Sequence, residues 1–147
     1  SRGLGDVYKR QGLRAPQPAP VTRAVTGFQN WEQTPDGTWF RWSARYSSLF
    51  VDERVTHIDI PMRGPRPAGS PVNHVEITAD GRRVTELNVG DDWTMASFEL
   101  PPARPTAGSH LRRIDLRLAY VTPVERLVPG GTGPDVGIQV GRTVERP

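Results

Sequence analysis

The segment Gly27-Phe-Gln-Asn-Trp-Glu-Gln-Thr-Pro-Asp-Gly-Thr-Trp-Phe-Arg-Trp-Ser43 holds three of the four tryptophans of the chain. Its middle, Thr34-Pro-Asp-Gly37, predicts a β-turn, because proline presets φ for a type I turn and glycine accepts the positive φ that closes it. Aromatic residues on both sides of this turn are typical of strands. We therefore expect the two halves of the segment to pair as a β-hairpin.

Alternation of apolar and polar residues recurs along the rest of the chain, with no convincing helical periodicity. A period of two residues is the pattern of a strand with one buried and one solvated face, which is common in antiparallel sheets. Fifteen prolines and fifteen glycines divide the chain into short pieces. The alternating segments are Val55–Met62, Thr94–Leu100, Leu111–Val121 and Val136–Val140.

A second hairpin is predicted between Asn73 and Val89, around the two-residue type I′ turn Asp80-Gly81. Regular pairing from that turn would set Val75 opposite Glu86 and leave Leu87 out of phase with the core. One extra residue near Thr85-Glu86 restores the phase, so we expect a β-bulge there. About eight strands result. The fold class predicted is all-β, a two-sheet antiparallel β-sandwich of jelly-roll or immunoglobulin-like type.

The N-terminus differs from the rest of the chain. Asp6-Val-Tyr-Lys-Arg-Gln11 resembles the translated adapter of a sequencing library, so we expect residues 1–11 to be an artefact and the natural protein to begin upstream. Residues 12–20 form a Pro/Ala linker. We therefore predict a tail and linker over residues 1–20 and a single β-sandwich domain over residues 21–147.

Composition excludes several classes of function. The chain has a net charge of +3. Residues 1–11 carry +2 of this charge, which leaves 16 basic and 15 acidic residues in the remainder, too even a balance to favour nucleic acid. Eighteen of the basic residues are arginines that mostly alternate with acids, as on a solvated face. There is no cysteine, and no apolar run is long enough for direct membrane insertion.

No catalytic or metal-binding constellation is apparent. His57, His74 and His110 fall in three different elements, without the spacing of zinc ligands. Asp91-Asp92 precedes Trp93 in a predicted turn, where capping of the turn is favoured over a calcium contact. No nucleophile elbow or phosphate-binding loop is present. We therefore expect no enzyme activity from this chain and no cofactor.

The aromatic residues are the remaining candidates for function. In Trp39-Phe-Arg-Trp42, alternation places Phe40 and Trp42 on one face, which we expect to be the core, and Trp39 with Arg41 on the other. Trp31 on the partner strand is then close enough to Arg41 for a cation–π contact. Exposed tryptophans also serve sugar-binding modules, because a flat ring covers the apolar face of a pyranose, so structural packing and a sugar platform both remain open. The candidate ligand-binding residues are Trp31, Trp39, Arg41 and Trp93.

An ordered set of short motifs over roughly residues 27–121 resembles the C-terminal β-sandwich domain that follows the membrane helices of bacterial family-39-like glycosyltransferases, relatives of the dolichyl-phosphate-mannose–protein mannosyltransferases. In that family the catalytic acids lie in the membrane part, so the resemblance transfers no catalytic residue to this chain. The motifs are Gly27-Phe28, Trp31-Glu32, Asp36-Gly37, Phe40-Arg-Trp-Ser43, Leu49-Phe-Val51, Val75-Glu-Ile77 with Asp80-Gly81, Asp92-Trp93 before Leu100-Pro101, and Arg113-Ile-Asp-Leu116.

Two functions follow as expectations. The resemblance implies a non-catalytic, extracytoplasmic accessory domain, tethered through upstream sequence to the membrane domain of the same parent protein. The exposed aromatic residues favour the alternative, a carbohydrate-binding module of a secreted or surface protein. The expected partner is thus either that membrane domain or a glycan.

Overall fold

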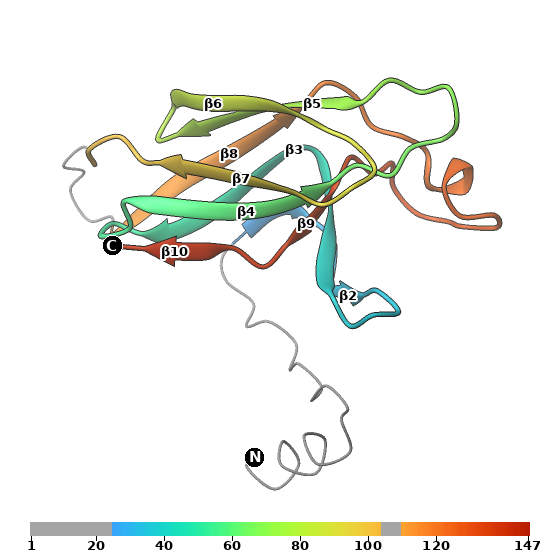
Figure 1. The fold of residues 1–147 in the computed structure, drawn as a ribbon, viewed down its shortest axis with the longest axis horizontal. Coiled ribbons are helices and arrows are strands. Elements are labelled where there is room, and N and C mark those ends of the chain that lie inside the picture. The colour runs from blue at the N-terminus through green and yellow to red at the C-terminus, as the bar shows by residue number, and fades with distance from the viewer. Residues whose placement is uncertain (1–24, 104–109) are drawn as a thin grey trace, which may run out of the picture.

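The computed structural model describes residues 25–103 and 110–147 and shows an all-β fold of antiparallel strands (Figure 1). The predicted tail and linker at residues 1–20 lie outside the described residues. The only helix in the described part is the short 3₁₀ helix η1 (Val124–Arg126). The strands are β1 (Val25–Phe28), β2 (Glu32–Gln33), β3 (Trp39–Asp52), β4 (His57–Arg63), β5 (Asn73–Ala79), β6 (Arg82–Val89), β7 (Thr94–Glu99), β8 (Leu111–Leu118), β9 (Gln139–Gly141) and β10 (Val144–Arg146).

The strands join in one curled sheet, in the order β10-β4-β9-β3-β8-β5-β6, with β1 and β2 paired to β3 and β7 paired to β4. The long strand β3 lies in the middle of this path and links its two halves. Its residues 40–42 pair with β9, and its residues 46–52 pair with β8. The prediction of about eight strands is wrong, since ten lie within the described residues. A strand that was missed is β10, which has three residues and is too brief to show alternation.

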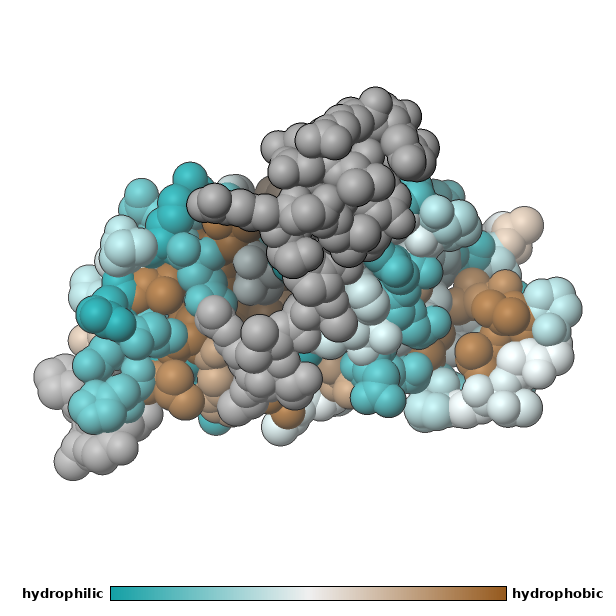
Figure 2. Space-filling view, turned by 90° about the horizontal axis from the view of Figure 1, so that it is seen from below, coloured by the Kyte–Doolittle hydropathy of each residue, from teal (hydrophilic) through white to brown (hydrophobic). Residues whose placement is uncertain are grey.

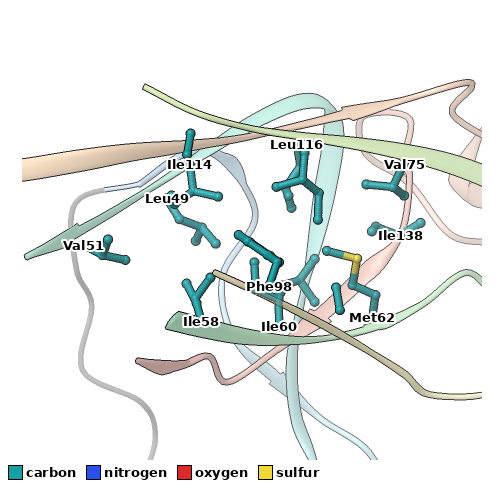
Figure 3. Packing of buried hydrophobic residues seen from close by; sticks show 14 of the residues in the cluster. Leu49, Val51, Ile58, Ile60, Met62, Val75, Phe98, Ile114, Leu116 and Ile138 are labelled. Atoms are coloured by element: carbon teal, nitrogen blue, oxygen red, sulfur yellow. The ribbon is translucent and has the colours of Figure 1, made fainter. Parts of the chain in front are cut away.

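The core lies between β4 and β7 on one side and β5 and β8 on the other (Figures 1 and 3). Ile58, Ile60 and Met62 of β4 are fully buried, and Figure 3 shows them facing Ile114 and Leu116 of β8. The alternation in β4, β7 and β8 therefore predicted the buried faces correctly. In Figure 2, which shows the molecule from below the view of Figure 1, hydrophobic residues form separate patches among hydrophilic ones.

Both predicted hairpins are present. The Gly37 N–H donates to Thr34 O at 2.9 Å, and Gly37 has a φ of 90°, which closes the turn between β2 and β3. Asp80 and Gly81 have φ values of 52° and 83°, as a type I′ turn requires.

The predicted bulge is confirmed, close to the expected place. Ile77 pairs with Thr85 and Thr78 with Arg83, so Val84 is the extra residue in β6. The shift brings Leu87 opposite Val75, as the hydrophobic pattern demanded.

The assignment of faces at the start of β3 was wrong in part. Phe40 is buried but lies outside the main core cluster, and Trp42 is only half-buried. Arg41, expected on the wet face, is 7% exposed. The face of Arg41 and Ser43 is the one that packs inward, since the Ser43 hydroxyl accepts the Ile138 N–H at 3.2 Å. Phe40 and Trp42 instead meet edge to face on the other side of the strand, with ring centroids 6.2 Å apart.

Candidate functional site

Trp39 and Trp93 line one pocket of about 360 Å³, here called the Trp39–Trp93 pocket. Trp39 opens β3, directly after the Thr34–Gly37 turn, and Trp93 lies in the connection between β6 and β7. Both rings are half-buried, so the prediction of a fully exposed Trp39 was too simple. The other lining residues are Gly37, Thr38, Pro61, Gly141 and Arg142.

Sheet pairing brings these distant segments together. Strand β9 lies between β3 and β4, with Gly141 opposite Phe40, and β7 continues the sheet beyond β4. Gly141 has no side chain, and a Cβ there would lie 3.2 Å from the Cβ of Pro61. The glycine thus lets β9 approach Pro61 closely without a side chain in the pocket.

The Trp93 ring is held in place by Arg63. The guanidinium carbon of Arg63 lies 4.8 Å from the centroid of the Trp93 ring, a cation–π distance. Arg63 Nε and Nη2 both donate to Gln139 Oε1, at 2.9 and 2.7 Å, which fixes the guanidinium over the ring. Trp93 is therefore a supported ring rather than a freely rotating surface side chain.

Trp31 and Arg41 form a separate group. The Arg41 guanidinium carbon lies 4.4 Å from the Trp31 ring centroid and 4.6 Å from that of Phe28. The predicted contact between Trp31 and Arg41 is therefore present. Burial lowers the pKa of Arg41 from its ordinary value. Neither residue lines the Trp39–Trp93 pocket, so the four candidates divide into a pocket pair and a packed stack.

A second hollow, of about 500 Å³, lies on the other side of Arg63 and is here called the arginine hollow. Trp42, Gln139 and Arg63 stand side by side on neighbouring strands, because Gln139 pairs with Trp42 on one side and with Arg63 on the other. The 3₁₀ helix η1 contributes Arg126. The residues that line it are Trp42, Arg63, Pro65, Arg66, Pro67, Asp91, Arg126, Leu127, Val128 and Gln139.

Ser97, His57 and Asp59 meet on the outer face of β4 and β7 but do not form a nucleophilic triad. Ser97 donates its hydroxyl directly to Asp59 Oδ1, and the same oxygen lies 2.9 Å from His57 Nε2. Ser97 Oγ is 3.5 Å from that same nitrogen. A triad histidine contacts serine and carboxylate through opposite ring nitrogens. The hydrogen bond from Ser97, and then that from His57, lowers the pKa of Asp59, so this carboxylate is a weaker base than an isolated aspartate.

The described parts of the chain lack both a cluster of metal-binding side chains and a membrane-spanning helix. Within residues 25–103 and 110–147, no three His, Asp or Glu side chains come together in a way that would hold a metal ion. The same residues include no helix with the length and apolar character needed to cross a bilayer.

The chain aligns with several solved structures at low similarity. A family 6 carbohydrate-binding module aligns over 84% of this chain and 86% of its own, at 11% identity and a TM-score of 0.46. The CBM51-2 and INT domains of Clostridium perfringens ZmpB align over 84% of this chain and 28% of their own, at 10% identity and a TM-score of 0.45. A glycoside hydrolase family 43 arabinoxylan arabinofuranohydrolase of Bacillus subtilis, in complex with cellotetraose, aligns over 76% of this chain and 22% of its own, at 10% identity and a TM-score of 0.38. All three TM-scores lie below 0.5, so these likenesses assign neither a family nor a ligand to this chain.

No protein-family model matches the chain, and no curated protein matches its sequence.

Proposed function

We propose that this chain is a carbohydrate-binding domain and that the Trp39–Trp93 pocket holds the sugar. The observation that carries the proposal is that two tryptophans from distant segments line one pocket. Its volume of about 360 Å³ falls in the range of roughly 300–1,000 Å³ that is usual for small-molecule sites. An indole ring covers the apolar face of a pyranose, and Arg142 supplies hydrogen-bond donors for its hydroxyl groups.

The support of Trp93 by Arg63 favours binding over mere packing. A ring already fixed in its bound orientation loses little conformational entropy when a ligand arrives. Arg63 stacks on Trp93 through a cation–π contact, and two hydrogen bonds to Gln139 hold Arg63 in that position. Both pocket tryptophans also lie outside the main core cluster, so the fold does not need them as core residues.

We infer that the curled sheet folds over into the two layers of a β-sandwich, with the pocket at one side. The supporting feature is β3, whose first part pairs with β9 and whose second part pairs with β8, so that it belongs to both layers. The apolar faces of β4 and β8 meet across the core.

The wider context is a proposal drawn from the sequence resemblance. We propose that the domain acts outside the cytoplasm, beside the membrane domain of a family-39-like glycosyltransferase, and binds sugar without catalysing its transfer. Deleting residues 21–147 from the full-length parent and measuring sugar transfer in membranes tests this. Unchanged acceptor use and unchanged location would contradict it, as would sugar transfer by the isolated chain.

Titration calorimetry with short oligosaccharides of glucose, xylose, mannose and galactose tests sugar binding directly. Trp93→Ala and Trp39→Ala should each weaken binding at least about tenfold, or about 1.4 kcal/mol. Tyr46→Ala is the matched control, because Tyr46 is an aromatic side chain with 58% exposure that lines neither hollow. Equal affinity in Trp93→Ala and the wild type, with the fold intact by circular dichroism, would refute the assignment of the pocket.

A further inference from the structure

The arginine hollow and the Trp39–Trp93 pocket share a wall. Arg63 lines the hollow, Trp93 lines the pocket, and the two side chains stack at 4.8 Å. A ligand that rests against Trp93 is therefore next to the guanidinium of Arg63. One extended molecule can fill both spaces.

The arginine hollow carries excess positive charge. Arg63, Arg66 and Arg126 face a single carboxylate, that of Asp91, which leaves a net charge of +2. Asp91 lies 3.5 Å from Arg66 Nη1, and its side chain is 65% exposed. Arg66 Nη1 is itself buried and has no hydrogen-bond partner among the described residues.

Two guanidinium groups in the hollow, those of Arg63 and Arg126, have no carboxylate partner in the ion pairs of the described residues. Arg54, Arg113 and Arg146 each contact an aspartate oxygen at 2.9–3.1 Å. Arg126 is exposed and makes no ion pair with any described residue. Three guanidinium groups beside one carboxylate in a concave space favour an anionic ligand, because guanidinium binds carboxylate and sulfate oxygens through charge-assisted hydrogen bonds.

We propose that the arginine hollow binds the carboxylate or sulfate group of an anionic glycan, while a neighbouring sugar ring of the same glycan lies in the Trp39–Trp93 pocket. This proposal rests on the proposed function and names the class of sugar. Trp42 and Gln139 complete the hollow with a further ring and an amide for the charged sugar.

A glycan fits this surface better than a single-stranded nucleic acid does. A protein that binds single-stranded nucleic acid has a continuous basic groove along the backbone, since every nucleotide carries a phosphate. Here three arginines gather in one hollow, whereas Asp52, Asp59 and Asp115 offset arginines elsewhere on the surface. Occasional charges along a sugar chain match one local basic site.

The test is titration calorimetry with three probes: oligogalacturonate, sulfated dextran oligosaccharide, and a neutral gluco-oligosaccharide of the same length. The wild type should bind an anionic probe at least about tenfold more tightly than the neutral one, and Arg126→Gln should remove most of that preference. Arg117→Gln is the control, because it removes the same charge from an exposed residue of β8 outside both hollows. It should leave the preference intact. The relative affinities of the first two probes identify whether carboxylate or sulfate is preferred.

The outcomes separate this inference from the proposed function. Binding of the neutral probe that depends on Trp93, without preference for either anionic probe, overturns the inference and leaves the proposed function standing. Anionic binding that is lost in Arg126→Gln but unaffected by Trp93→Ala overturns the proposed function. An equal loss in Arg117→Gln shows non-specific attraction and overturns the inference, as does tighter binding of a single-stranded oligonucleotide.

Discussion

Replacing Arg112 by methionine tests how the two sides of the fold are held together. The Arg112 side chain is 4% exposed, and its Nε lies 3.0 Å from Asp80 Oδ2, in the turn between β5 and β6. Its other nitrogens donate to the carbonyl oxygens of Val55, at 3.5 Å, and of Pro101. One guanidinium thus joins β8, a hairpin turn and two loops. Methionine keeps the apolar stem and removes only these polar contacts.

The expected cost of Arg112→Met follows from those contacts. Removing one partner of a buried ion pair typically costs about 3–5 kcal/mol, because the other charge is left without compensation. The Asp80 side chain is 25% exposed and regains some water. The cost therefore falls near the lower end, at about 3 kcal/mol of unfolding free energy.

Urea denaturation followed by tryptophan fluorescence measures this cost. Arg117→Met is the matched control, because it makes the same substitution on β8 at an exposed position and should change stability by less than about 0.5 kcal/mol. If both variants unfold at the same urea concentration, the reasoning about the buried guanidinium is refuted.

Two further predictions concern the loops and turns. Hydrogen bonds from the Arg54 side chain, and then from its backbone, lower the pKa of Asp52 to about 2. The ionised Asp52 carboxylate therefore stabilises the folded state fully above its ordinary pKa of 3.8, and this contribution is lost as pH falls through about 2. Arg54→Ala should raise that pKa toward 3.8 in an NMR titration, and an unchanged pKa would disprove the coupling. Gly27 and Gly130 have φ values of +77° and +75°, but only at Gly27 would a Cβ meet a backbone atom, Tyr46 O, at 2.3 Å. Gly27→Ala should therefore lower the melting temperature in calorimetry far more than Gly130→Ala, and equal melting temperatures would count against the clash.

Much of the fold was predictable because local rules fix it. The turn at Asp80-Gly81 needs positive φ, and the phase error at Leu87 required an extra residue, which the structure places at Val84. Burial at the start of β3 was not predictable in the same way. Apolar character favoured Phe40 and Trp42 as core residues, but Trp42 is only half-buried, and the Arg41 guanidinium is buried against two aromatic rings.

The site was predictable only in its aromatic residues. Tryptophans stand out in a sequence, and two of the three proposed, Trp39 and Trp93, do line one pocket. Arg63 and Arg142 gave no such indication, since the sequence has eighteen arginines in similar polar settings. Their role depends on β9 lying between β3 and β4, a strand order that no local pattern specifies.

The most direct test of the central claim is an NMR titration that follows the indole N–H signals of the four tryptophans while an oligosaccharide that binds in calorimetry is added. The signals of Trp39 and Trp93 should shift together along one binding curve, because both rings line the pocket. The Trp31 signal, in the separate stack with Arg41, should stay in place. A shift of Trp31 without Trp39 and Trp93 would contradict the assignment of the sugar site to this pocket.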